Sequence, residues 1–258
     1  MPAVSAAILP GAEPFLHDGR PEGVLVLHGF SGNPHSMRPV ADALADAGWS
    51  VSLPLLPGHG TVMEDMVPTR WDDWSAAAED AYQHLAARCD AVALVGLSMG
   101  GSLGCWLAER HPEIRGLALV NPLVQPPPAS VVTTVRQLVD SGTEIVPGIG
   151  SDIAKEGGVE VTYEGSPLRA VLSLFAGVQE VAAGLGKISC PVLLLSSRQD
   201  HVVDPASGDR LVAEVGGPVE RVWLERSYHV ATLDHDADEV VARTCELVHS
   251  VLHGDADR

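Results

Sequence analysis

The sequence predicts an α/β fold, in which a mostly parallel sheet carries helices on both faces. Short apolar runs of strand length alternate along the chain with amphipathic segments of helical length. The 258 residues, of which 46% are hydrophobic and 19% charged, are enough for one large domain with a substantial core. The alternation is interrupted between residues 122 and 187, so we expect an insertion within this domain.

The expected strands are apolar runs, and helix-like segments separate most of them. Short βα units of this kind give parallel strands with helices on both faces of the sheet. Asp72, Pro205 and Asp236 are expected to start helices, because such residues favour the first positions of a helix. The expected strands are residues 24–27, 50–53, 91–95, 117–120, 192–196 and 219–224, and the expected helices are residues 37–47, 71–87, 102–109, 205–215 and 237–252.

The insertion has the pattern of a small cap. It begins with three consecutive prolines and contains two amphipathic segments on either side of a glycine-rich loop. Insertions at the carboxyl ends of parallel strands lie over the active site, so we expect this cap to select the substrate; the alternative is an additional helical layer. The predicted core is residues 1–121 and 188–258, the cap is residues 122–187, its amphipathic segments are residues 131–139 and 168–178, and its loop is residues 148–158.

A Gly-x-Ser-x-Gly motif, residues 96–100, lies between an expected strand and an expected helix. A serine at such a sharp turn has a strained backbone, and its hydroxyl projects above the edge of the sheet. The helix that begins at Met99 directs its N-terminal amides toward an anion formed near this serine. We therefore predict that Ser98 is a nucleophile; the alternative is a glycine-rich turn with an uninvolved serine.

A serine nucleophile needs a histidine base and an acid that orients the histidine. Asp200 is the first carboxylate after the strand expected at residues 192–196 and is the predicted acid. Asp204 is the alternative, although its position favours a helix cap. His229 follows the last expected strand and is the predicted base, with His235 as the alternative.

An oxyanion hole requires two backbone amides that point at the developing charge. Met99 follows the predicted nucleophile and supplies one of them. Phe30 lies in the glycine-containing turn after residues 24–27 and is the candidate for the other. His28 and His59 lie in glycine turns, and we expect both to hold loops rather than act as bases.

Charge and motifs exclude several other functions. The formal net charge is −18, and Lys155 and Lys187 are the two lysines, so a nucleic-acid partner is not expected. Lipid contact would require an apolar patch, because an anionic membrane repels such a chain. The histidines lack metal-ligand spacing, and there is no dinucleotide or nucleotide loop, so we expect no metal and no cofactor.

Four widely separated cysteines indicate a reducing compartment. Residues 1–15 lack the basic region and the apolar core of a signal peptide. No later stretch is expected to be apolar over the roughly 20 residues that a membrane span requires. We therefore predict a cytoplasmic protein, peripheral at membranes if it contacts them.

Five blocks of the sequence together resemble the bacterial monoacylglycerol lipases of the α/β-hydrolase superfamily. The resemblance extends over nearly the whole chain. The Pro-His-Ser-Met-Arg-Pro and Ser-Tyr-His-Val-Ala-Thr-Leu-Asp sequences are its most specific parts, whereas Gly-x-Ser-x-Gly occurs throughout the superfamily. The cap departs most from the family pattern. The blocks are residues 28–39, 57–61, 96–101, 200–203 and 227–234.

This resemblance implies an α/β-hydrolase fold and a serine esterase without a cofactor. It implies hydrolysis of monoacylglycerols to glycerol and fatty acid through an acyl-enzyme, with Ser98, Asp200 and His229 as the triad. It also implies that the amides of Phe30 and Met99 form the oxyanion hole. A general short-chain carboxylesterase with the same triad is the alternative; other hydrolase-fold chemistry and a fold that only binds a ligand are further alternatives.

The resemblance further implies a glycerol site in the cap. Glu160 matches a glutamate that contacts the glycerol hydroxyls, and Asn121 and Ile149 match residues near the glycerol pocket. A carboxylate can accept hydrogen bonds from two hydroxyls and would disfavour a second acyl group. The alternatives are that Glu160 is a solvent-exposed glutamate or that Glu164 is the ligand. The expected partner is a small neutral lipid, with transient membrane contact through the cap, and the expected state is a monomer or a homodimer.

Overall fold

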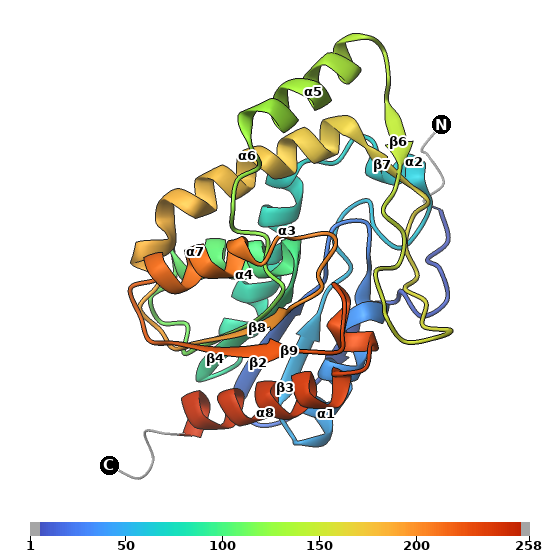
Figure 1. The fold of residues 1–258 in the computed structure, drawn as a ribbon. Coiled ribbons are helices and arrows are strands. Elements are labelled where there is room, and N and C mark those ends of the chain that lie inside the picture. The colour runs from blue at the N-terminus through green and yellow to red at the C-terminus, as the bar shows by residue number, and fades with distance from the viewer. Residues whose placement is uncertain (1–5, 254–258) are drawn as a thin grey trace.

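The chain folds around a mixed sheet that is parallel except at one edge (Figure 1). The computed structural model describes residues 6–253; residues 1–5, part of the segment considered above for a signal peptide, and residues 254–258 lie outside the described part. The strands of this sheet are β1 (Phe15–His17), β2 (Glu22–Leu27), β3 (Ser50–Leu53), β4 (Ala91–Leu97), β5 (Leu117–Val120), β8 (Val192–Ser197) and β9 (Val219–Leu224). Their order is β1-β3-β2-β4-β5-β8-β9, with β1 antiparallel to β3.

Helices cover both faces of this sheet, as Figure 1 shows. Helices α1 and α8 pack on one face, and α3, α4 and α7 pack on the other. The helices of the core are α1 (Arg38–Asp46), α2 (Met63–Met66), α3 (Trp71–Ala86), α4 (Met99–Ala108), α7 (Ala206–Glu214) and α8 (Ala237–His253), with 3₁₀ turns η1 (Pro34–Met37) and η3 (Ala231–Leu233).

The central strands supply both hydrophobic cores. Successive side chains of a strand point to opposite faces, so a strand covered on both sides is apolar throughout. In β2, Leu25 and Leu27 pack on the side of α3 and α4, whereas Val24 and Val26 pack on the side of α1 and α8. These four side chains are fully buried. The continuous apolar runs in the sequence therefore follow from burial on both faces.

The six strands and five helices predicted for the core are present, with small differences at their ends. One of the predicted helix starts, Asp72, needs correction. Helix α3 begins at Trp71, and Asp73 rather than Asp72 accepts a hydrogen bond from the Arg70 N–H at its start. Asp236 directly precedes α8, and its backbone carbonyl accepts the Val240 N–H, as predicted for a helix start, while its carboxylate binds Arg226.

A segment between β5 and β8 contains elements of its own. These elements are α5 (Ala129–Asp140), β6 (Ile145–Pro147), β7 (Gly165–Pro167), α6 (Leu168–Gly184) and η2 (Leu185–Lys187). Helix α6 packs against α3 and α4, and α5 packs against α6. Figure 1 shows α5 as the outermost helix of this segment, and none of its residues is fully buried.

One helical segment, Leu168–Lys187, is long and apolar enough to cross a membrane by length and composition alone, with mean hydropathy 1.4. The expectation that no stretch is apolar over about 20 residues is therefore wrong for this segment. Half of its most apolar part is buried inside the protein. A core helix of a water-soluble protein passes the same test, so this segment is weak evidence for a membrane span.

Candidate active site

Ser98 lies at the turn between β4 and α4. Its φ of 55° and ψ of −117° are a backbone conformation that residues other than glycine rarely adopt. The flanking glycines are required by close approach of the backbone. A Cβ on Gly96 would lie 2.3 Å from the Gly100 carbonyl oxygen, and a Cβ on Gly100 would lie 2.1 Å from the Leu27 carbonyl oxygen. Gly96 is thus required by the close approach of β4 to the first turn of α4, and Gly100 by the close approach of α4 to β2.

The loop after β2 lies against Ser98. A Cβ on Gly29 would lie 3.4 Å from the Ser98 Cβ, within van der Waals contact, so the loop lies directly against the serine. Phe30 follows Gly29 and lines the cavity that contains Ser98. Met99 is the first residue of α4. The two amides predicted for an oxyanion hole therefore belong to segments on either side of the Ser98 hydroxyl.

His28 holds this loop, as the sequence predicted. Its Nδ1 lies 3.0 Å from the Gly29 carbonyl oxygen, and the Leu56 N–H donates to its Nε2 over 3.2 Å. An Nε2 that accepts a hydrogen bond requires the proton on Nδ1, so the ring is neutral. Burial and, to a lesser extent, the nearby His59 lower the pKa of His28 to about 3, although the hydrogen bond with Gly29 opposes this shift. His28 is therefore unsuited to act as a base near neutral pH.

His59 also has a loop-holding contact. Its Nδ1 lies 2.9 Å from the Pro57 carbonyl oxygen, and its ring packs edge-on against Phe30 and Trp74. Burial lowers the pKa of His59 to about 4. The ring is consequently neutral and supports the loop that carries Phe30.

The predicted acid and base are in contact. Asp200 Oδ2 lies 2.8 Å from His229 Nδ1, and the side chains of both residues are nearly buried. The other carboxylate oxygen, Oδ1, accepts the N–H groups of Val202 and Val203, each over 2.8 Å. These bonds fix the carboxylate, and the carboxylate fixes the proton of His229 on Nδ1. The Nε2 atom is then available as a base.

The alternative acid also lines the cavity, but neither it nor the alternative base takes part in the contact between Asp200 and His229. Asp204 is exposed, and its Oδ1 accepts the Ala206 N–H at the start of α7 over 2.8 Å, as expected for a helix cap. His235 is exposed and does not line the cavity, whereas His229 does. The structure therefore brings together Asp200 and His229 rather than the alternative pair.

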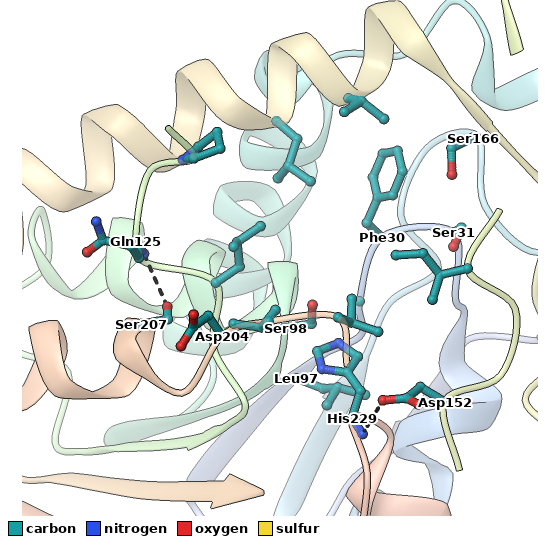
Figure 2. A pocket seen from close by; sticks show the side chains of 18 of the residues that line it. Phe30, Ser31, Leu97, Ser98, Gln125, Asp152, Ser166, Asp204, Ser207 and His229 are labelled. Carbon is teal, nitrogen blue, oxygen red and sulfur yellow. Dashed lines mark hydrogen bonds between the residues drawn. The ribbon is translucent and has the colours of Figure 1, made fainter. Parts of the chain in front are cut away.

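Ser98 and His229 face a cavity of about 750 Å³ between the core and the inserted segment (Figure 2). The core contributes the loops after β2, β4, β5, β8 and β9, which all leave the same edge of the parallel sheet. The inserted segment contributes mostly apolar side chains from the prolines and α6, together with polar groups near its glycine-rich loop. The residues from the inserted segment are Gln125, Pro126, Pro127, Pro128, Ile149, Gly150, Asp152, Glu160, Ser166, Val171, Leu174 and Phe175.

Glu160 is half-buried and lines this cavity, whereas Glu164 is exposed and does not. A Cβ on Gly32 would lie 2.8 Å from Glu160 Oε1, so the glutamate packs directly on the loop that carries Phe30. Burial raises the pKa of Glu160 to about 7, while nearby His229 and a hydrogen bond with Ser36 partly offset the rise. The cavity thus contains a carboxyl group that titrates near neutral pH.

Asn121 and Ile149 have different positions. Asn121 does not line the cavity, which corrects the expectation that it lies near a glycerol pocket. Its Nδ2 donates to the His229 carbonyl oxygen over 2.8 Å, and its Oδ1 accepts the Ser197 N–H over 2.7 Å. Asn121 therefore connects the ends of β5 and β8 to the histidine loop. Ile149 lines the cavity and is 68% exposed.

Sequence reasoning missed Asp152, which lies in the glycine-rich loop of the inserted segment and contacts the backbone of His229 over 3.0 Å. The signal was weak, because a lone aspartate in such a loop has many structural roles. Asp234 is the last residue of the sequence block 227–234. Its buried carboxylate accepts the N–H groups of Ala154, Lys155, Tyr228 and His235.

The parallel sheet, the strained serine after β4 and the buried histidine–aspartate pair define a protein with the α/β-hydrolase fold. A family model described as alpha/beta hydrolase fold matches residues 23–143, and one described as serine aminopeptidase, S33, matches residues 159–236.

Individual relatives agree with this class. The chain is 42% identical over 243 residues to a thermostable monoacylglycerol lipase of Bacillus sp. (strain H-257). This alignment covers 93% of this chain and 95% of that protein. It is 28% identical to a carboxylesterase of Bacillus subtilis (strain 168), over 88% of this chain and 92% of that protein. A solved structure of the metagenome-derived lipolytic enzymes LipS and LipT is 38% identical and matches with TM-score 0.90 over 94% of this chain and 99% of that chain.

The chain belongs to the bacterial monoacylglycerol lipase family of α/β-hydrolases, and it is an ester hydrolase. A solved monoacylglycerol lipase of Paleococcus ferrophilus, 18% identical with TM-score 0.75 over 92% of this chain and 98% of that chain, shares the fold.

Proposed function

We propose that this protein hydrolyses monoacylglycerols to glycerol and a free fatty acid through a covalent acyl-enzyme on Ser98. The observation that carries the proposal is the position of Glu160, a half-buried carboxyl group in the same cavity as Ser98 and His229. An apolar wall for an acyl chain and a carboxyl group for hydroxyls are the two features that a monoacylglycerol requires. The identity to a monoacylglycerol lipase supports the same substrate.

In the proposed mechanism, His229 removes the proton from the Ser98 hydroxyl as the oxygen attacks the ester carbonyl carbon. Asp200 orients the ring and stabilises the imidazolium. The backbone amides of Phe30 and Met99 donate to the oxyanion of the tetrahedral intermediate. His229 then donates the proton to the departing glycerol oxygen. In the second half-reaction, His229 deprotonates a water molecule as its oxygen attacks the acyl carbonyl carbon. His229 then returns this proton to Ser98 Oγ as the bond between Oγ and the acyl group breaks and the fatty acid leaves.

Recognition of the substrate would follow from the two ends of the cavity. We propose that the acyl chain packs along Leu174, Phe175 and the prolines, and that the glycerol hydroxyls bind Glu160 near Ile149. A second acyl chain on the glycerol would place an apolar group against the carboxyl group of Glu160 without a hydrogen bond, which is unfavourable. The preference for one acyl chain would therefore arise from a polar wall rather than from size alone.

We also propose that residues 122–187 act as a cap, because they supply about half of the cavity wall. The net charge of −18 and four free cysteines support a neutral lipid substrate, no nucleic-acid partner and a cytoplasmic location. Transient contact of the cap with a membrane and a monomeric or homodimeric state belong to the same proposal.

The competing candidate is a general carboxylesterase, which the match to the Bacillus subtilis carboxylesterase favours. Fatty-acid release from a medium-chain monoacylglycerol, the matching di- and triacylglycerols and the matching methyl ester separates the two. We expect the monoacylglycerol to be cleaved with the highest kcat/KM. Equal or faster cleavage of the methyl ester would contradict recognition of glycerol and favour the carboxylesterase.

A further inference from the structure

Asp152 of the inserted segment contacts both loops that carry the histidine–aspartate pair. Its Oδ2 accepts the His229 N–H over 3.0 Å and the His201 N–H over 3.1 Å. Its Oδ1 lies 2.7 Å from His201 Nδ1. Its backbone carbonyl oxygen accepts the Val230 N–H over 3.1 Å. Figure 2 shows the bond from the His229 backbone to Asp152 beside the cavity.

The Asp152 carboxylate is nearly enclosed, with a side-chain exposure of 11%. Burial alone would raise the pKa of Asp152, but the hydrogen bonds from His201 and His229 outweigh it and hold the pKa below its usual value. The group is therefore ionised at neutral pH, when its oxygens act only as acceptors. Hydrogen bonds to an ionised group in a water-poor site are among the stronger ones in proteins.

These contacts fix the distance between two separate loops. His201 directly follows Asp200, and the His229 backbone N–H belongs to the residue whose ring must reach both Asp200 and Ser98. A single carboxylate thus holds the loop of the acid and the loop of the base. We propose that Asp152 is a positioning residue for His229. This inference rests on the proposed function, in which Ser98, His229 and Asp200 form the triad.

A second carboxylate attaches the same loop independently. Asp234 accepts the N–H groups of Ala154 and Lys155 over 2.7 and 2.9 Å, and that of Tyr228 over 2.8 Å. The glycine-rich loop therefore stays attached to the histidine loop when the Asp152 side chain is changed. We expect Asp152 variants to fold, so their activity reports on the position of His229.

Two substitutions separate the hydrogen bonds from the charge. In Asp152→Asn, the amide oxygen can accept both backbone N–H groups, and the NH₂ group can donate to His201 Nδ1 after a change of tautomer. In Asp152→Ala, every side-chain bond is lost. We expect Asp152→Ala to lower kcat on the order of 10- to 100-fold with KM little changed, and Asp152→Asn to remain within about threefold of the wild type.

The measurement is kcat and KM on a monoacylglycerol and on the matching methyl ester, together with the second-order rate of inactivation by a fluorophosphonate probe well below the melting temperature. In Asp152→Ala, kcat on each of the two esters and the rate of inactivation should all fall by the same factor. Glu156→Gln changes an exposed carboxylate in the same loop and should match the wild type.

Wild-type kcat in Asp152→Ala, or an equal loss in Asp152→Asn, would overturn the proposal. A loss confined to the monoacylglycerol would also overturn it, because Asp152 would then contact the substrate instead of positioning His229. Preference of the wild type for the methyl ester would contradict the proposed substrate alone, since the ratio of variant to wild type on that ester still tests Asp152.

Discussion

The chemistry proposed for this protein depends on the position of one hydroxyl group. Ser98 has a strained backbone at the start of α4, and the residue is 8% exposed and lines the cavity. Strain of this kind persists where the surrounding packing determines the backbone, and here the close approach of Gly96 and Gly100 does so. The backbone conformation is therefore a property of the turn rather than of the serine hydroxyl.

For this reason we expect Ser98→Ala to fold normally and to lose ester hydrolysis by roughly 10⁴-fold or more. Fatty-acid release and circular dichroism measure the two halves of this prediction. In the wild type, mass spectrometry after fluorophosphonate treatment should find the adduct on the peptide that contains Ser98. An Ala variant that still releases fatty acid at the wild-type rate would assign the nucleophile to another residue.

Glu160 is the residue on which the substrate proposal depends. Glu160→Gln retains the size of the side chain but replaces one acceptor oxygen with a donor. We expect kcat/KM for a monoacylglycerol to fall by a factor that corresponds to a loss of about 1 to 3 kcal/mol of transition-state binding. The fall in kcat/KM for the methyl ester should be smaller. Steady-state kinetics on both esters provide the measurement. Equal losses would show that Glu160 supports the loop of Phe30 and does not contact glycerol.

The residues that the sequence could indicate are those with a local signal. Ser98 lies in a strand–turn–helix motif, and Asp200 and His229 each follow an apolar strand. Asn121 was misplaced because its role depends on the partners that the fold brings to it, Ser197 and the His229 carbonyl. Asp152 was missed for the same reason, since its partners lie 49 and 77 positions away along the chain.

Burial on both faces of the sheet determined which strands could be predicted from the sequence. The parallel strands are continuous apolar runs and were found from the sequence. Strand β1 was missed because it has three residues and lies at the edge, where Leu16 is 69% exposed. The short pair β6 and β7 was also missed, because its strands contain proline and glycine and lack alternation. Contacts with neighbouring elements rather than local propensity define these short strands.

The packing of α6 on α3 gives a prediction for the inserted segment. A Cβ on Gly177 would lie 2.0 Å from the ring of Trp71, which is itself 3% exposed and has little room to move. We expect Gly177→Ala to displace α6 and to lower the free energy of unfolding by about 1 to 3 kcal/mol, the usual cost of overpacking. Thermal or urea denaturation measures this change.

The control for this helix is Ala176→Ser, at the adjacent exposed position, which should change stability by less than about 0.5 kcal/mol. Because α6 supplies Val171, Leu174 and Phe175 to the cavity wall, Gly177→Ala should also raise KM for long acyl esters more than for short ones. Unchanged stability in Gly177→Ala would show that Trp71 relaxes without cost and that the two helices are loosely packed.

At the scale of the whole molecule, buried carboxyl groups link stability to pH. Glu109 directly follows α4 as its C-terminal cap, and its side chain is 3% exposed. Its Oε1 has no hydrogen-bond partner among the described residues, and Arg110 Nη1 is 3.5 Å from its Oε2. Burial raises the pKa of Glu109 to about 7, although the charges of Arg110 and Lys187 oppose the rise. The carboxyl group is therefore neutral in the folded protein over a pH range in which it is ionised in the unfolded chain.

The sign of the effect follows from proton uptake. Between the ordinary pKa of 4.5 and about 7, the folded state holds a proton that the unfolded state has released, so stability falls as pH rises through this range. Glu109→Gln removes this titration, and the variant should gain about 1 to 3 kcal/mol relative to the wild type between pH 5 and pH 8. Other groups with shifted pKa values, including Glu160 and Asp152, are present in both proteins and cancel in the difference. Urea denaturation at pH 5 and pH 8 gives the difference directly, and a constant difference between the two proteins would show that Glu109 is ionised in the folded state throughout.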